Sequence, residues 1–415
     1  MIPLNPAELE IDLLCKGLRI APSCTLEEDA RSFSRTRAGL GSGLELTLPA
    51  SGKRIWVNVP VFEPFAQRSP YLLVKRDRRY AVRDGRTTGL EYPVDLPSRP
   101  DWYDRSTARG TPMTQVGVLQ GTYLGIYFSK TCLFWQMNPS EACRFCTTGL
   151  NVGVNEAAEK SVEDVVETAL AAKGENGVTF VHFNSGYQEG RGLDEAAPYV
   201  KAVKERVGAL VGLQVIPSHQ MWKYDWLMDL GVDHFSFCYE FHNPEYFAKY
   251  LPGKQSRVGQ ETFFRAMEYC AKKMGKGRAS GEIIAGIEPV EDTLKAIDYI
   301  TGAGCFPTVC IFRPLHGAPM SDLPSPPYED MVTIMRHMYE ACMKNGLPIG
   351  MAPNIEVSLI VNPDDAKYLA APTWAKALYE TRLKVVRTLL APAFAWKMRP
   401  RPVKSDAFAY AKAPA

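Results

Sequence analysis

The sequence predicts an α/β fold in which a β-rich N-terminal extension precedes six consecutive strand–helix units. From about residue 126 to residue 346, short apolar segments alternate with longer helical segments, and glycines follow several of the predicted helices. The residues before 126 instead alternate at period two between Pro- and Gly-rich spacers. Strands that alternate with helices form parallel sheets, so the six units predict one parallel sheet covered on both faces.

The N-terminal region is predicted to form a β-rich cap. Segments 44–48 and 54–59 alternate partly between apolar and polar residues. Segments 71–74 and 80–82 flank a charged turn, which predicts a hairpin. We therefore divide the chain into a cap region, a strand–helix region and a C-terminal extension with a tail: 1–125, 126–346 and 347–415.

The strand–helix units follow one another without interruption. The predicted strands are 126–128, 177–183, 210–216, 234–239, 282–286 and 308–313. The helices that follow them are 161–174, 194–207, 224–230, 261–274, 290–303 and 328–345. Ser161 and Asp164 resemble a capping box at the start of the first of these helices. Six units in about 220 residues suit a partial barrel that is open on one side, and a doubly wound open sheet is the alternative.

In either layout, ligands bind beyond the carboxyl ends of the parallel strands. Cys132, Cys143 and Cys146 follow the first predicted strand at that end, and the last two form a CxxC pair. Three thiolates are one fewer than a closed zinc site or an ordinary [4Fe-4S] cluster uses. A cluster with three protein ligands keeps one iron open for a small molecule. A zinc site completed by a histidine is the alternative, with four candidates: His182, His219, His234 and His242.

Composition and charge argue against several partners. The 415 residues carry a net charge of +2, which gives no electrostatic case for a nucleic acid or an anionic membrane. No run of 18 apolar residues occurs, and residues 1–14 lack the leading basic cluster of a signal peptide. We therefore expect a cytoplasmic protein with no membrane or nucleic-acid partner. The cysteines outside the cluster are expected to be buried thiols rather than disulfides.

The cysteine cluster and the strands after it resemble the radical S-adenosylmethionine (SAM) superfamily, with a biotin-synthase-like core over about residues 120–320. Members of that superfamily place three clustered cysteines after the first strand of a (β/α)6 partial TIM barrel. Here ten residues, rather than three, separate Cys132 from Cys143, as in subgroups with a longer loop. Four segments resemble more weakly a set of uncharacterised radical SAM proteins encoded beside nitrilase genes: 37–41, 116–121, 252–254 and 284–289.

The resemblance implies a set of cofactor contacts. Cys132, Cys143 and Cys146 would hold a [4Fe-4S] cluster whose fourth iron binds SAM. The implied SAM contacts lie at the ends of the second, fourth, fifth and sixth strands: Asn184, Ser185, Gly186, Glu240, Gly286, Glu288 and Arg313. Three of these have structural alternatives, which are an ion pair with Lys249 or Lys254 for Glu240, a helix start for Glu288, and a structural ion pair for Arg313.

The resemblance also implies a reaction. An electron from the reduced cluster cleaves SAM, and the resulting 5′-deoxyadenosyl radical abstracts hydrogen from a bound small molecule. The electron would come from an external donor such as flavodoxin or ferredoxin. The sequence identifies neither the substrate nor a catalytic residue. The alternatives are a radical SAM enzyme that modifies RNA or a peptide, and a non-catalytic iron–sulfur or zinc-binding protein.

The histidines are expected to divide into two groups. His219 and His242 lie in loops after strands, where a side chain meets a substrate, so they are the candidates for substrate contact. His182 and His234 lie within or at the start of apolar strands and are expected to be packed in the core.

Overall fold

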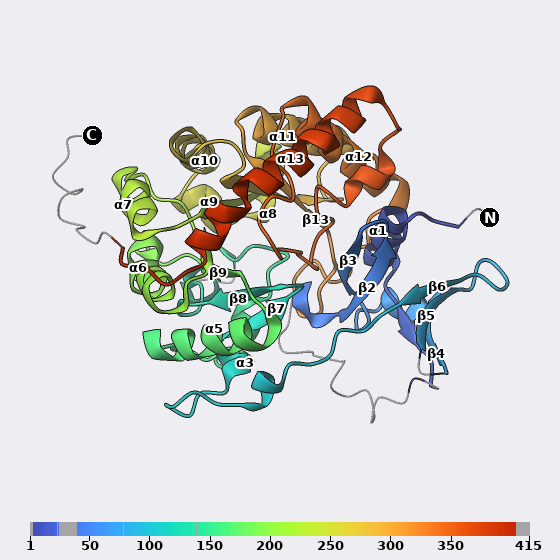
Figure 1. The fold of residues 1–415 in the computed structure, drawn as a ribbon, viewed down its shortest axis with the longest axis horizontal. Coiled ribbons are helices and arrows are strands. Elements are labelled where there is room, and N and C mark those ends of the chain that lie inside the picture. Colours follow the sequence, from blue (N-terminus) through green and yellow to red (C-terminus); the bar gives the residue numbers. More distant parts are fainter. Residues whose placement is uncertain (1–2, 23, 25–39, 78, 138–139, 404–415) are drawn as a thin grey trace.

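A curled sheet of seven strands organises the computed structural model, which describes residues 3–22, 24, 40–77, 79–137 and 140–403 (Figure 1). The strand order is β13-β12-β11-β10-β9-β8-β7. Strands β8 to β13 run parallel and follow one another in chain order, whereas β7 pairs antiparallel with β8 at the edge. The sheet curls like half of a barrel, which confirms the mixed α/β fold.

The sheet's strands are β7 (Val118–Gln120), β8 (Tyr123–Tyr127), β9 (Phe180–Asn184), β10 (Leu210–Gln214), β11 (His234–Glu240), β12 (Ala279–Ala285) and β13 (Phe306–Ile311). The helices among and after them are α4 (Leu133–Met137), α5 (Val162–Asn176), α6 (Gly192–Ala202), α7 (Trp222–Leu230), α8 (Pro244–Tyr250), α9 (Pro252–Arg257), α10 (Gln260–Met274), α11 (Val290–Gly302) and α12 (Tyr328–Lys344). Each of the six predicted strands overlaps an observed strand, and the first, fifth and sixth observed strands begin and end earlier than predicted.

Local sequence signals explain where the helices begin and end. The capping box at Ser161 is confirmed, because its side chain accepts the Asp164 N–H and the Asp164 carboxylate accepts the Ser161 N–H. Helix α5 ends at Gly177, whose φ of 64° places it in the left-handed region that glycine adopts readily. Helices α8 and α9 were not predicted, because each is one or two turns long and begins at a proline.

The described part of the N-terminal region contains two small sheets and two α-helices, and the sequence predicted neither helix. Strands β2 (Leu44–Ala50) and β3 (Lys53–Val59) form one antiparallel pair. The other sheet has the order β1-β4-β5-β6, and its members are β1 (Arg19–Ile20), β4 (Tyr71–Arg76), β5 (Arg79–Asp84) and β6 (Glu91–Val94). The predicted hairpin is therefore β4–β5. Helix α1 (Pro6–Lys16) begins at a capping box formed by Asn5 and Glu8. A short helix, α3 (Met113–Val116), precedes β7.

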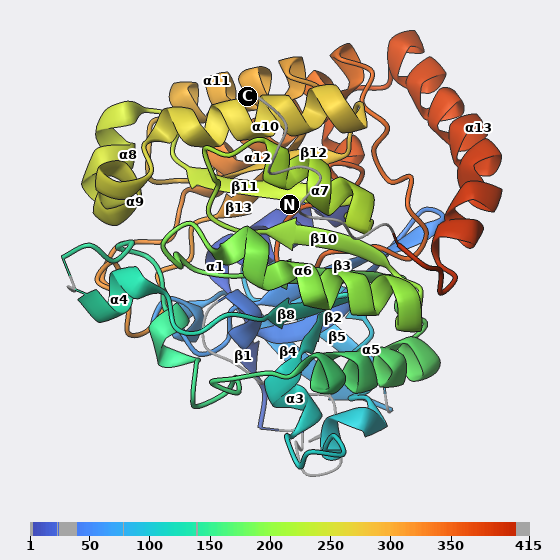
Figure 2. The same ribbon diagram turned by 90° about the vertical axis from the view of Figure 1, so that its left-hand side faces the viewer.

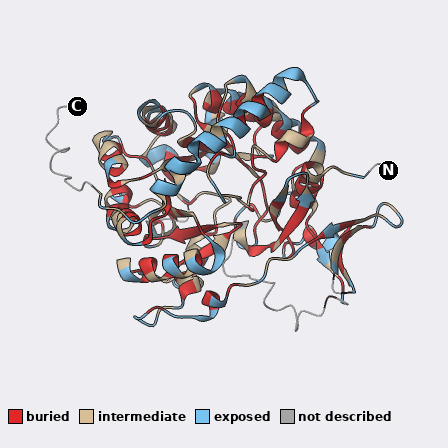
Figure 3. Cartoon of the chain, in the orientation of Figure 1, coloured by how far each residue is buried: buried red, intermediate tan, exposed pale blue. Residues whose placement is uncertain are grey.

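Within the C-terminal extension, α13 (Trp374–Lys397) is a continuous helix of 24 residues that the sequence did not predict. Only Tyr379 and Leu383 among its residues are buried, so the sequence carries no continuous inward-facing apolar stripe. Figure 2 shows α13 along the outer edge, and Figure 3 shows that most of it is exposed. Of the predicted tail, residues 404–415 lie outside the described residues.

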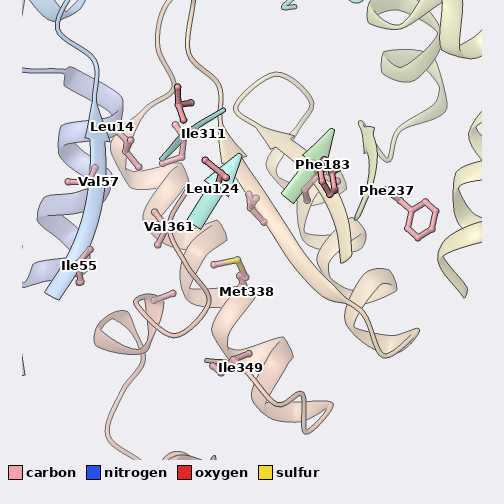
Figure 4. Close-up of a cluster of buried hydrophobic side chains, with 14 of the residues drawn as sticks. Leu14, Ile55, Val57, Leu124, Phe183, Phe237, Ile311, Met338, Ile349 and Val361 are labelled. Atoms are coloured by element: carbon pink, nitrogen blue, oxygen red, sulfur yellow. The ribbon is translucent and has the colours of Figure 1, made fainter. Parts of the chain in front are cut away.

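One hydrophobic core joins the N-terminal region to the curled sheet. Leu14 of α1 and Val57 of β3 belong to the same buried cluster as Leu124 of β8, Ile311 of β13 and Met338 of α12 (Figure 4). Strands β7 and β8 also begin before residue 125, so the predicted boundary there falls inside the sheet. In the described part of the chain, no helix combines the length and the apolar character that a membrane crossing requires.

Candidate metal centre and cavity

A cavity of about 810 Å³ is lined by residues from β9 to β13 and from the loops that follow β8 and β9. Its walls come from alternate residues of the strands, because successive side chains of a strand point to opposite faces. On β9, Phe180, His182 and Asn184 line the cavity, whereas Val181 and Phe183 are buried on the opposite face. The same alternation on β13 brings Phe306, Thr308 and Cys310 to the wall.

The three clustered cysteines line this cavity together. The Tyr187 N–H donates to Cys132 Sγ at 3.3 Å. The Cys146 thiol bonds to Thr148 Oγ1 at 3.1 Å and accepts the Thr148 N–H at 3.4 Å. Burial raises the pKa of the Cys132 and Cys143 thiols above the ordinary value of 9.0. A bound metal would therefore have to supply the stabilisation of their thiolates.

The loop that carries Cys132 is held by the loop after β9. The Gly186 N–H donates to Tyr127 Oη at 3.1 Å, and the Tyr127 hydroxyl donates to the Lys130 carbonyl at 3.1 Å. Gln188 Nε2 donates to the same carbonyl at 2.9 Å. These bonds connect the end of β8 to the end of β9, which places Cys132 beside the predicted SAM-binding segment.

Two features of that segment fit a cluster with a polar ligand. A Cβ at Gly186 would lie 2.3 Å from Cys132 Cβ and 2.8 Å from its Sγ, so only glycine allows this approach. Ser185 Oγ is buried, faces the cavity and has no hydrogen-bond partner in the described part of the chain. A hydroxyl in that state is costly unless a ligand supplies its partner. Within the described ranges, no three His, Cys, Asp or Glu side chains are gathered closely enough to hold a single metal ion.

Glu240, at the end of β11, lines the cavity but already has a cationic partner. Lys254 Nζ donates to both of its carboxylate oxygens, at 2.8 and 2.7 Å, and to the Cys238 carbonyl at 2.6 Å. Of the two lysines considered from the sequence, Lys254 is therefore the one that pairs. Burial raises the pKa of Glu240 to about 7, although Lys254 opposes this shift.

Gly286 and Glu288 are not among the residues that line the cavity. Gly286 has a φ of 98°, and a Cβ there would lie 2.2 Å from Pro326 Cγ. A Glu288 carboxylate oxygen accepts the N–H groups of His242 and Asn243, each at 2.9 Å. Burial raises the pKa of Glu288 to about 7. Glu288 thus connects the segment after β12 to the segment after β11, and Gly286 packs against the segment after β13.

Arg313 reaches the cavity wall, but its guanidinium forms a buried ion pair. Nε and Nη2 lie 2.7 and 2.6 Å from Glu63 Oε1, and Nη2 donates to Ser42 Oγ at 3.3 Å. The structural ion pair considered from the sequence is therefore present. It ties β13 to the N-terminal region.

The histidines lie in the opposite places from those expected. His182 and His234 line the cavity, whereas His219 and His242 do not. Both cavity histidines are neutral near pH 7, because burial lowers the pKa of His182 to about 4 and that of His234 to about 3. The strand alternation that directs His182 to one face was visible in the sequence. The sequence did not show that this face borders a large cavity.

Sequence reasoning also missed a polar group inside the cavity. Gln214, Cys238 and Glu282 lie on three neighbouring strands and bond to one another. Gln214 and Glu282 are polar residues in mainly apolar strands, which is the signal that was available. The described geometry defines a class of protein, an α/β half-barrel whose interior cavity is lined by three cysteine thiols.

Several known proteins are similar to this chain at low sequence identity. The chain matches no protein-family model. It is 22% identical over 324 residues to the bacteriochlorophyllide c C-7(1)-hydroxylase of Chlorobaculum limnaeum, which covers 68% of this chain and 80% of that protein.

Three solved structures also match. Methylornithine synthase (PylB) has 19% identity and a TM-score of 0.41, over 63% of this chain and 80% of that one. HydG, a maturase of the [FeFe]-hydrogenase, has 13% identity and a TM-score of 0.42, over 64% and 67%. The radical SAM methyltransferase TsrM from Kitasatospora setae, bound to cobalamin and a [4Fe-4S] cluster, has 12% identity and a TM-score of 0.40, over 88% and 76%.

Proposed function

We propose that this enzyme cleaves SAM reductively at a [4Fe-4S] cluster held by Cys132, Cys143 and Cys146, and that the 5′-deoxyadenosyl radical abstracts hydrogen from a small-molecule substrate. The observation that supports this best is that the three thiols line the same cavity as the inward faces of β9 to β13. Strands β8 to β13 and their helices would then form the (β/α)6 partial TIM barrel of the superfamily.

The chain's own residues have distinct tasks in this proposal. The three cysteines bind the cluster, and Ser185 Oγ, which lacks a partner, orients SAM beside Cys132. Asn184 and Gly186 border the same site, and the glycine leaves space for it. The apolar strand residues exclude water from the reacting atoms. Glu240 contributes to the cavity wall as an ion pair with Lys254, and Arg313 contributes to it as an ion pair with Glu63.

The size of the cavity favours a small substrate. A volume of about 810 Å³ lies within the range of roughly 300–1,000 Å³ that small-molecule sites occupy. Since the curated relative is named as a hydroxylase, oxidation at a carbon centre is the first reaction class to test. A flavodoxin- or ferredoxin-type donor and a cytoplasmic location complete the proposal. For Gly286 and Glu288 we retain only a positioning role behind the cofactor site.

The test is anaerobic reconstitution with iron and sulfide, followed by dithionite and SAM, with 5′-deoxyadenosine quantified by mass spectrometry. Wild type should form 5′-deoxyadenosine, and Cys143→Ala/Cys146→Ala should form none. Cys342→Ala is the matched control, because that thiol is buried in α12 and does not line the cavity. Equal amounts from wild type and the double variant would overturn the proposal.

A further inference from the structure

Glu282 is a carboxylate that faces the cavity and has no cationic partner among the described residues. It lies in the middle of β12, and the surface it exposes is cavity wall. Its Oε2 accepts a bond from Gln214 Nε2 at 2.9 Å and from the Cys238 thiol at 2.7 Å. Both donors are neutral. Lys254 is the cation whose charge acts on Glu282, but its ammonium group is bound to Glu240.

The other acidic residues of the described cavity wall have cations beside them. Asp233 lies 2.5 Å from Lys204 and 2.8 Å from Lys397. Asp364 lies 2.6 Å from Lys53. Glu156 lies 3.3 Å from Lys160. The neutral side chains around Glu282 supply hydrogen bonds but no compensating charge, and an uncompensated buried carboxylate is expensive. Such a group is stabilised when a ligand brings the positive charge.

The position of Glu282 separates it from the cysteines. It lies three residues before the end of β12, so it is about 10 Å below the carboxyl edge of the strand. Cys238 is its register partner on β11, and Gln214 ends β10. The next inward residue of β12 is Ile284, which is apolar. At this point of β12 the cavity wall therefore offers a polar anchor next to an apolar side chain, at a depth suited to a substrate held below the cofactor.

We propose that Glu282, supported by Gln214 and Cys238, binds a protonated amine or a similar cationic nitrogen of the substrate. The substrate class is then a small molecule with an apolar body and one cationic group. A carboxylate oxygen accepts N–H donors from an ammonium group, and such a donor brings the positive charge that the Gln214 amide and the Cys238 thiol do not supply. The inference that this ligand is a substrate rests on the proposed radical SAM function, but binding of the cation does not.

Three probes of one size test the charge requirement: hexylammonium, hexanol and hexanoate. Hexylammonium at millimolar concentration should raise the thermal midpoint of the reconstituted protein, because a ligand that binds the folded state stabilises it. The other two should shift it at least fivefold less. Glu282→Gln should lose the hexylammonium shift, whereas Glu268→Gln, a carboxylate on α10 away from the cavity, should keep it. Equal shifts for the three probes, or a shift retained in Glu282→Gln, would overturn the proposal.

A second measurement needs no variant. Cys238 lies beside Glu282, so aminoethyl methanethiosulfonate should label it at least tenfold faster than sulfonatoethyl methanethiosulfonate, after each rate is divided by its rate with free glutathione. Peptide mass spectrometry assigns the adduct to Cys238. No labelling by the cationic reagent, or equal rates for the two, would contradict a cation site.

Adding SAM at a saturating concentration distinguishes a substrate site from the SAM-binding site. The hexylammonium shift should persist in its presence, and its loss would assign Glu282 to SAM binding and overturn the proposal. Cys143→Ala/Cys146→Ala should also retain the shift. Failure of the 5′-deoxyadenosine assay with an intact amine effect would then refute the radical function alone, and the converse would refute the cation site alone.

Discussion

Gly186 is the residue at which the loop after β9 comes closest to Cys132. The two lie so near that a Cβ at position 186 would be 2.3 Å from the Cys132 Cβ. The sequence placed the three cysteines and this segment at the same edge of the sheet, because both follow parallel strands. It did not reveal that a hydrogen atom in place of a methyl group is what lets them touch.

Gly186→Ala should therefore lower the iron content of the reconstituted protein severalfold and reduce its stability by about 1–3 kcal/mol, because the loop must move away from Cys132. Iron analysis and denaturant unfolding measure the two effects. Gly174→Ala is the control, since a Cβ there meets nothing within 4 Å. Full iron loading of Gly186→Ala would show that the contact is unimportant.

The raised pKa of Glu288 predicts how the free energy of unfolding depends on pH. Burial raises its pKa from the ordinary 4.5 to about 7, so between these values the folded chain holds a proton that the unfolded chain has released. The free energy of unfolding should then fall as the pH rises through this window, by an amount on the order of 2 kcal/mol. Glu288→Gln cannot titrate, so it should make the fall smaller by this amount, whereas Glu240, whose pKa burial also raises to about 7, keeps its own contribution.

Denaturant unfolding at pH 5 and pH 7.5 checks this expectation for wild type and Glu288→Gln. Glu291→Gln, an exposed position in the first turn of α11, should keep the wild-type pH dependence. The same slope in wild type and Glu288→Gln would mean that Glu288 is ionised across the whole window.

Elements with a strong period were predictable, and elements defined by tertiary contacts were not. The strands of the curled sheet carry continuous apolar runs, and α10 to α12 carry regular apolar faces, so their positions followed from the sequence. Helix α13 has exposed apolar residues at Trp374 and Leu389 and few buried ones, so its pattern does not indicate a packed helix. The formation of this helix depends on the surface against which it packs.

The docking of α13 predicts opposite outcomes for two leucines on the same helix. Leu383 is 9% exposed and Leu389 is 73% exposed. Leu383→Ala should lower the free energy of unfolding by about 2–3 kcal/mol, because it leaves a cavity, whereas Leu389→Ala should change it by less than about 0.5 kcal/mol. Denaturant unfolding compares the two variants. Similar losses of unfolding free energy would mean that Leu383 and Leu389 are buried to a similar extent.

At the scale of the whole molecule, the N-terminal region and the curled sheet form one body. They share a hydrophobic core, and the Arg313–Glu63 ion pair connects them with side-chain exposures of 4% and 3%. Arg313 was singled out in the sequence, but its partner is 250 residues away, and no local pattern identifies such a pair. The same holds for the position of Glu282, which became a candidate only when the cavity was visible.

Breaking that ion pair should destabilise the molecule. Arg313→Met leaves the Glu63 carboxylate buried without its partner, which should cost about 3–5 kcal/mol of unfolding free energy. Glu63→Leu added to Arg313→Met should recover most of the loss, because neither charge is then buried alone. Denaturant unfolding of both variants provides the check. A double variant as unstable as the single one would show that the pair does not connect the two regions.

Electron paramagnetic resonance of the reconstituted, dithionite-reduced protein, with and without SAM, tests most directly whether the three cysteines hold a cluster with an open iron. We expect a [4Fe-4S]⁺ signal that changes when SAM is added, because SAM would bind that iron. Cys143→Ala/Cys146→Ala should give neither the signal nor the change. A wild-type cluster signal that SAM leaves unaltered, or no cluster signal at all, would contradict this assignment.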